Sequence, residues 1–257
     1  MKVVILAGGP GTRITEESEI KPKPLIEIGE MPIIWHIMKE YSYYGFNDFV
    51  ICAGHKQHMI KEWFADYFLY TSDVTFDLTN DNKMIVHNKT SEPWKVTIVN
   101  TGKDTRTAGR VKRIVDYLDE GPFMLTYGDG VCDVDIQKLY EYHKQNDKLL
   151  TITAVKSIQE KGVLEITNDN TVKSFREKSS VDSSLINAGY MVVEKEVLDY
   201  IKDDNTSLES DVITKLVEEG KVGSYIHEGY WQCMDTIREK MELERLWQAN
   251  KALWKKW

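Results

Sequence analysis

The stretch Lys2-Val-Val-Ile-Leu-Ala-Gly-Gly-Pro-Gly-Thr-Arg13 decides the fold class of this 257-residue chain. It begins with an unbroken β-branched hydrophobic run, which is typical of a parallel strand covered on both faces. Glycines end this run, and the stretches 48–53 and 123–127 have the same hydrophobic character. Amphipathic helical patterns at 59–67 and 111–118 lie between the second and third of these runs. The alternation predicts an α/β protein with a Rossmann-like, mixed but mostly parallel sheet flanked by helices.

The remainder of the chain is more varied. Further β-like runs occur at 149–155, 163–167 and 188–193, and the segment 236–257 is expected to be helical. Residues 70–100 carry scattered polar side chains and weak alternation, which indicates an inserted loop or hairpin that covers a site or contacts a neighbouring subunit.

No linker or repeat divides the sequence. We therefore expect one continuous domain over residues 1–257, with a first half at 1–135 and a second half at 136–257.

Charge and composition exclude some classes of protein. The 33 basic and 41 acidic residues give a net charge of -8, which argues against a nucleic-acid partner. An anionic small ligand would need local lysine and arginine, or a divalent cation. The hydrophobic run at the N-terminus is too short for a membrane span or a signal peptide. The three cysteines lie about 80 to 100 residues apart without metal-ligand spacing, so we expect a reducing compartment, the cytoplasm.

The glycine-rich turn is the first candidate for ligand binding. Glycines allow backbone N–H groups to approach phosphate oxygens, and Arg13 and Lys23 would supply positive charge. The spacing matches neither the Walker pattern nor the dinucleotide pattern, which disfavours a Rossmann oxidoreductase. Taken alone, the turn could also be a strand end followed by the proline-stiffened connection Lys21-Pro-Lys-Pro24.

Leu-Ala-Gly-Gly-x-Gly-Thr-Arg followed by Lys-Pro-Lys-Pro resembles the N-terminal hallmark of the sugar-1-phosphate nucleotidyltransferases. Further blocks are similar to the glucose-1-phosphate cytidylyltransferase subfamily, so the resemblance covers nearly the whole chain; they lie at 32–38, 92–94, 126–130 and 231–236.

The resemblance implies a Mg²⁺-dependent transfer of CMP from CTP to a phosphorylated small molecule, with release of pyrophosphate. It makes the first half mainly nucleotide-binding and the second mainly acceptor-binding, and it implies a homo-oligomer. The implied catalytic residues are Arg13, which would grip pyrophosphate, Lys23, which would bridge phosphates, and Asp129. The implied nucleotide-binding residues are Leu6, Ala7, Gly8, Gly9, Gly11, Thr12, Arg13, Lys23, Gly109, Arg110 and Gly128.

Two carboxylates are candidate metal ligands. Asp129 follows a hydrophobic strand in a Gly-Asp-Gly turn, where open α/β sheets place their ligands. Asp235 lies far away in sequence on an aromatic-flanked segment. Each could be an ordinary turn or cap residue, but the resemblance implies that both bind Mg²⁺, together with triphosphate oxygens and water.

The resemblance also assigns base and acceptor contacts. Arg110 would read cytosine, although by itself it could be a solvated residue at a helix start. The implied acceptor-binding residues are Glu177, Lys178, Asn187 and Gly189.

Departures from the family pattern concentrate on the acceptor side. Glu160-Lys161-Gly162 replaces Arg-Phe-Gly, Ser179 replaces proline, Ala188 replaces glycine, and Leu208-Glu209-Ser210-Asp211 replaces Trp-Glu-x-Glu-Pro. A pocket with altered polar groups changes its substrate. The acceptor is therefore either glucose 1-phosphate or another compound, such as an amino-acid phosphate of the phosphoglutamine type used in capsule or surface-polysaccharide modification. A non-catalytic homologue that senses nucleotides is the alternative from a different class.

Overall fold

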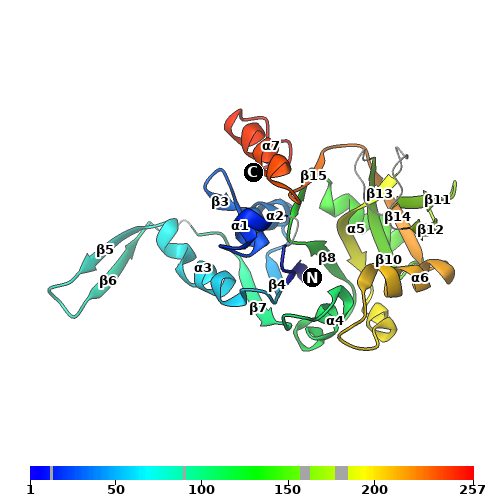
Figure 1. Cartoon of the computed structure of the whole chain (residues 1–257), viewed down its shortest axis with the longest axis horizontal. Helices are drawn as coiled ribbons and strands as arrows, with labels where there is room; N and C mark the ends of the chain where they lie inside the picture. The colour runs from blue at the N-terminus through cyan, green and yellow to red at the C-terminus, as the bar shows by residue number, and fades with distance from the viewer. Residues whose placement is uncertain (12–13, 89–90, 157–162, 177–184) are drawn as a thin grey trace.

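The computed structural model describes residues 1–11, 14–88, 91–156, 163–176 and 185–257. Within these ranges nine strands form a central sheet in the order β12-β11-β13-β8-β1-β4-β7, and β10 joins β13 to β14 (Figure 1). The strands are β1 (Val3–Ala7), β4 (Asp48–Ala53), β7 (Lys95–Asn100), β8 (Phe123–Tyr127), β10 (Leu150–Lys156), β11 (Val163–Ile166), β12 (Val172–Arg176), β13 (Leu185–Val193) and β14 (Val222–His227).

Strands β8, β1, β4 and β7 run parallel to one another, and β13 joins β8 in antiparallel orientation. The predicted Rossmann-like α/β fold with a mixed sheet is therefore confirmed. The α-helices are α1 (Thr15–Ser18), α2 (Ile33–Tyr43), α3 (Gln57–Tyr70), α4 (Thr107–Lys112), α5 (Ile136–Gln145), α6 (Thr214–Glu218) and α7 (Ile237–Gln248). Short 3-10 turns occur at η1 (Lys23–Leu25), η2 (Val115–Tyr117) and η3 (Lys195–Tyr200), and η4 (Leu208–Ile213) is a π-helix. None of the helices in the described ranges is long and hydrophobic enough to cross a bilayer.

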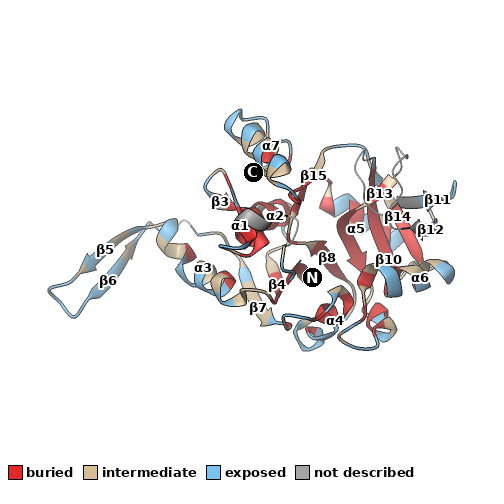
Figure 2. Ribbon diagram, in the orientation of Figure 1, coloured by how far each residue is buried: buried red, intermediate tan, exposed pale blue. Residues whose placement is uncertain are grey.

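The central strands of the sheet, such as β1, β4 and β8, are buried on both faces (Figure 2). Along β1, Val3 and Ile5 pack in one core with α2, α3, α5 and α7, whereas Val4 and Leu6 pack in a second core with α4, α6, η3 and η4. Successive side chains of a strand point to opposite faces, so a strand inside two cores must be hydrophobic at every position. This is why the first run carries no polar residue.

Three small antiparallel sheets complete the fold. They pair β2 (Glu27–Ile28) with β3 (Met31–Pro32), β5 (Asp73–Asp77) with β6 (Lys83–His87), and β9 (Gly130–Cys132) with β15 (Trp231–Cys233). The hairpin of β5 and β6 projects away from the body of the protein (Figure 1).

Two expectations need correction. The segment 70–100 contains the expected hairpin, but its last six residues form β7, an edge strand whose one partner in the described ranges is β4. Edge position leaves this strand half-buried, which explains its weak hydrophobic pattern. The helix expected over 111–118 ends at Lys112, and Val115 is exposed in the 3-10 turn that follows.

The C-terminal segment is helical only in its first part. Helix α7 begins with a capping box between Thr236 and Glu239 and ends at Gln248. Beyond it Trp254 is fully buried and packs against His36 of α2, whose Nε2 lies 2.8 Å from the carbonyl oxygen of Ile28. Burial lowers the pKa of His36 to about 4, so this ring is neutral at physiological pH.

Candidate active site

A pocket of about 840 Å³ opens at the carboxyl ends of β1 and β8. These neighbouring parallel strands bring the turn at Gly8 beside the turn at Gly128, and the Gly128 N–H donates to the Leu6 carbonyl oxygen at 3.0 Å. Open α/β sheets bind ligands at this edge. The geometry therefore joins the two glycine turns that the sequence analysis singled out.

Most of the residues predicted for the site line this pocket. They are Leu6, Ala7, Gly8, Gly9, Gly11, Lys23, Arg110, Gly128, Asp129, Asn187 and Asp235. Thr12, Arg13, Glu177 and Lys178 lie outside the described residues, as do the departures at 160–162 and at Ser179.

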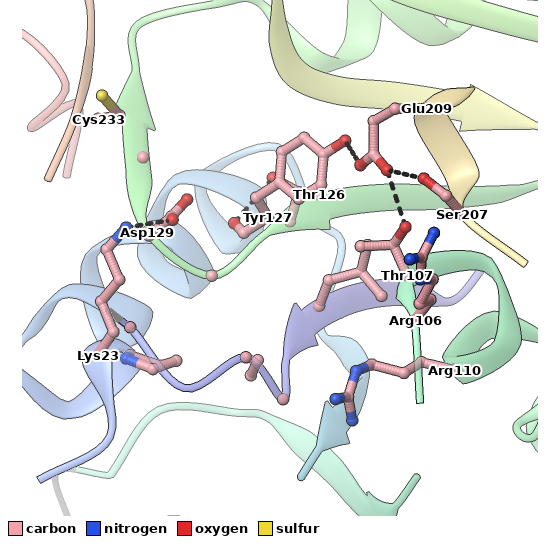
Figure 3. Close-up of a pocket in the computed structure, with 18 of the residues that line it drawn as sticks. Lys23, Arg106, Thr107, Arg110, Thr126, Tyr127, Asp129, Ser207, Glu209 and Cys233 are labelled. Atoms are coloured by element: carbon pink, nitrogen blue, oxygen red, sulfur yellow. Dashed lines mark hydrogen bonds and ion pairs between the residues drawn. The ribbon is translucent and has the colours of Figure 1, made fainter. Parts of the chain in front are cut away.

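Lys23 connects the two candidate metal ligands. Its Nζ lies 2.5 Å from Oδ2 of Asp129 and 2.5 Å from Oδ1 of Asp235, and both Lys23 and Asp235 are buried (Figure 3 shows the pair with Asp129). Burial opposes the charge of Lys23, but the two carboxylates outweigh it and raise the pKa of the ammonium group above its ordinary value. A cation thus already lies between these two carboxylates.

The small sheet of β9 and β15 brings the carboxylates together. Gly130 pairs with Cys233, and the Met234 N–H donates to the Asp129 carbonyl oxygen at 2.8 Å. Asp129 precedes Gly130 by one residue and Asp235 follows Cys233 by two, so the pairing fixes the backbone of both aspartates. No group of three or more His, Cys, Asp or Glu side chains suited to a metal is found among the described residues. Any metal held here would take its other ligands from substrate and water.

Arg110 is buried rather than solvated at the helix start. Its guanidinium donates to Oγ1 of Thr101 at 2.9 Å and to the carbonyl oxygens of Gly102 at 2.6 Å and Lys103 at 3.2 Å. Burial lowers the pKa of this guanidinium. A Cβ atom at Gly8 would lie 2.2 Å from Nη1 of Arg110, so a larger residue there would have to displace this guanidinium. The Arg110 guanidinium therefore packs against the glycine turn at Gly8.

Gly109 and Gly189 do not line the pocket in this structure, although both lie next to it. A Cβ atom at Gly109 would lie 2.6 Å from the carbonyl oxygen of Asp204. Gly189 has a φ of +84°, and a Cβ atom there would lie 2.4 Å from Cδ2 of Tyr127. The side-chain oxygen of Asn187 accepts the Gly189 N–H at 2.7 Å. These glycines shape the walls behind the pocket.

The sequence analysis missed Glu209 on η4. Its carboxylate accepts hydrogen bonds from Tyr127 Oη at 2.5 Å, Thr107 Oγ1 at 2.8 Å and Ser207 Oγ at 2.9 Å (Figure 3). The available signal was its place in the segment that departs from the family pattern. No local pattern predicted that this carboxylate would join three separate elements.

Two exposed basic residues that the sequence analysis did not single out also line the pocket. Lys103 and Arg106 lie just before α4, on the same side as Arg110. They add positive charge to a pocket that must accept anions if it binds a nucleotide.

A glycine turn at the end of β1, beside one carboxylate on the neighbouring turn and a second after β15, defines the site of an enzyme that transfers nucleotidyl groups. The chain belongs to the Nucleotidyl transferase family, whose model matches residues 2–251. It is 48% identical to the glucose-1-phosphate cytidylyltransferase of Salmonella typhimurium, with 100% of both chains covered. It is 39% identical to the probable glucose-1-phosphate cytidylyltransferase of Bacillus subtilis, again over 100% of both chains.

The fold is also that of solved structures. A putative glucose-1-phosphate thymidylyltransferase from Bacillus anthracis, crystallised with sucrose, superposes with a TM-score of 0.75. The two sequences are 20% identical, and the match covers 96% of this chain and 94% of the other. The family resemblance inferred from the sequence is confirmed.

Proposed function

We propose that this protein transfers CMP from CTP to glucose 1-phosphate, giving a CDP-sugar and pyrophosphate. Full-length identity of 48% to a glucose-1-phosphate cytidylyltransferase is the observation that carries the proposal. The pocket supports it, because its glycine turn and its basic residues suit a nucleotide and its paired carboxylates suit a divalent cation.

Asp129 and Asp235 fit a divalent cation and would hold Mg²⁺. Their oxygens already share one cation, the Lys23 ammonium group, and they face a pocket wide enough for a triphosphate. Carboxylate, phosphate and water oxygens are the ligands that Mg²⁺ prefers. When bound, the ion would polarise the α-phosphate and neutralise charge that develops during the reaction.

The reaction needs no nucleophile from the protein. A phosphate oxygen of the acceptor attacks the α-phosphorus of CTP, and the bond to pyrophosphate breaks. The residues around the pocket would act by alignment and charge neutralisation. Backbone N–H groups of the turn Gly8–Gly11 would contact phosphate oxygens, Lys23 would bridge phosphates near the reacting centre, and Arg13 would hold the departing pyrophosphate.

The acceptor side rests on the residues assigned by resemblance. Lys178 would face the acceptor phosphate and Glu177 a sugar hydroxyl, while Asn187 and Gly189 would form the neighbouring wall. Arg110 would contribute to cytosine binding by holding the turn at 101–103, because its guanidinium is already bonded to that turn.

The activity is tested with a matrix of four nucleoside triphosphates against a panel of phosphates, read by pyrophosphate release. We expect CTP with glucose 1-phosphate to give the fastest turnover, dependent on Mg²⁺. The panel includes phosphoglutamine. Faster turnover with that compound would refute the glucose assignment, and binding of CTP without turnover on any acceptor would favour the nucleotide-sensing alternative.

We propose that the hairpin of β5 and β6 contacts another copy of this chain. Its strands are in register, with Val74 opposite Val86 and Phe76 opposite Met84, so these four side chains share one face. Phe76 and Met84 are 59% and 43% exposed. An isolated two-stranded hairpin is marginally stable in water, and a partner subunit would cover this hydrophobic face.

The double variant Phe76→Ser with Met84→Ser is expected to lower the molar mass of the particle measured by light scattering after size exclusion. Ile85→Ser changes one hydrophobic residue on the opposite face of the same hairpin and is the matched control. An unchanged molar mass in the double variant would show that the hairpin face is not the subunit contact.

A further inference from the structure

Tyr190 lies directly behind the turn that carries Asp129. Its hydroxyl oxygen is 3.0 Å from the carbonyl oxygen of Gly130 and 2.8 Å from Oε2 of Glu40 on α2. Both Tyr190 and Glu40 are fully buried. A tyrosine of β13 therefore joins the backbone next to a proposed metal ligand to a carboxyl group in the core.

A bulge in β13 directs the side chain of Tyr190 into the core. The register of β13 against β10 shifts between Asn187 and Met191, which leaves extra residues on β13, and Gly189 takes its positive φ inside this bulge. Bulges re-aim side chains next to active sites. Here the bulge separates Asn187, which lines the pocket, from Tyr190, which points into the core.

We propose that Tyr190 is a positioning residue, which, held by Glu40, fixes the Gly130 carbonyl and so sets the spacing of the Asp129 and Asp235 carboxylates for the metal. This inference rests on the proposed function, since it concerns the same carboxylates. Gly130 pairs with Cys233, so a shift of Gly130 moves both proposed ligands together with respect to Lys23.

The number of protons that Tyr190 and Glu40 can donate supports this assignment. A phenol has one proton, so Tyr190 can donate to Gly130 only if Glu40 donates to Tyr190. Burial raises the pKa of Glu40 well above its ordinary value, which favours the protonated carboxyl group. The chain of donors then runs from the Glu40 carboxyl to the Tyr190 hydroxyl and on to the Gly130 carbonyl oxygen, with each proton used once.

A second bond links the same segments. Nε1 of Trp231, in β15, donates to the carbonyl oxygen of Ala188 at 2.8 Å. Strand β13 is thus fastened to β9 through Tyr190 and to β15 through Trp231. The segment predicted to bind the acceptor and the small sheet that carries the carboxylates form one unit.

The test is Tyr190→Phe, measured by the Mg²⁺ dependence of turnover and by Mn²⁺ binding to the nucleotide-free protein, followed by electron paramagnetic resonance. We expect the Mg²⁺ concentration for half-maximal activity to rise about 10-fold, and Mn²⁺ affinity to fall about 5-fold, because a buried carbonyl loses its donor. The KM for CTP is expected to stay within about 2-fold, since the glycine turn on β1 is not touched.

Tyr41→Phe is the matched control. Tyr41 is equally buried and stacks on Tyr190 at 5.8 Å, but within the described part of the chain its hydroxyl is bonded to neither Glu40 nor Gly130. A general loss of packing would affect both variants alike. If Tyr190→Phe keeps the metal dependence of Tyr41→Phe, the proposal is overturned.

A second pair of variants covers the case in which Tyr190→Phe does not fold. Glu40→Gln keeps a donor toward Tyr190 and should retain Mn²⁺ affinity, whereas Glu40→Met should lose it. Equal losses in both would overturn the donor role of Glu40. Asp129→Asn separates this proposal from the proposed function: if that variant stays active, the metal assignment itself fails, whatever Tyr190→Phe does.

Discussion

Asp129→Asn and Asp235→Asn should each lower the rate of CTP-dependent pyrophosphate release by at least about 1000-fold, a loss of about 4 kcal/mol in transition-state stabilisation. The amide keeps the shape of the side chain but removes its negative charge, so the cation that neutralises phosphate charge is held weakly. Turnover is measured with CTP and glucose 1-phosphate over a range of Mg²⁺ concentrations, because weak binding would be partly overcome at high Mg²⁺.

The fold should survive either substitution. Lys23 keeps one carboxylate partner in each single variant, so its buried charge is not left alone. Asp104→Asn is the matched control, since Asp104 is an exposed carboxylate that lines the same pocket. Full activity in both the Asp129 and the Asp235 variants, with normal thermal unfolding, would refute the metal assignment.

Lys23→Met should have two opposite effects. Turnover is expected to fall by at least about 100-fold, because a positively charged contact to the reacting phosphates is lost. Affinity of the nucleotide-free protein for Mn²⁺ is expected to rise about 10-fold, because the ammonium group now occupies the same two carboxylates that would bind the metal. Calorimetric titration with Mn²⁺ measures the second effect independently of catalysis.

Thermal unfolding gives a second measurement of the competition between Lys23 and the metal for the two carboxylates. Without Lys23, the two neighbouring carboxylates lose the ammonium group that lies between them, so the variant should unfold at a lower temperature and regain stability when Mn²⁺ is added. Lys103→Met, which removes an exposed lysine from the rim of the pocket, should do neither. Unchanged Mn²⁺ affinity in Lys23→Met would mean that Lys23 and the metal do not compete.

The elements that the sequence predicted well are those with strong local patterns. Strand β1 is hydrophobic at every position because it lies inside two cores, and this pattern is visible without a structure. Strand β7 was missed because an edge strand is only half-buried. The sequence predicted a helix over 111–118, whereas the helix spans 107–112. The prediction failed because Val111 and Ile114 are both buried with helical spacing, although the helix ends between them.

The residues of the candidate site also differ in how far the sequence could predict them. Glycines and aspartates at strand ends have a local signature, so the sequence predicted that the turn at Gly8 and Asp129 belong to the site, and both line the pocket. The roles of Arg110 and Glu209 depend on partners that only the tertiary fold supplies, namely the carbonyl groups at 102–103 and the hydroxyls of Thr107 and Tyr127. Sequence spacing does not encode such contacts.

The pairing of β9 with β15 has a consequence for biosynthesis. Asp129 and Asp235 are about 100 residues apart, so closing the loop between them costs chain entropy and waits for the second half of the sheet. A nascent chain that has reached residue 230 carries the glycine turn and Asp129, yet it lacks the second carboxylate. With Asp235 as a proposed metal ligand, we expect nucleotidyl transfer to begin only after the last strand of this pair has emerged and docked.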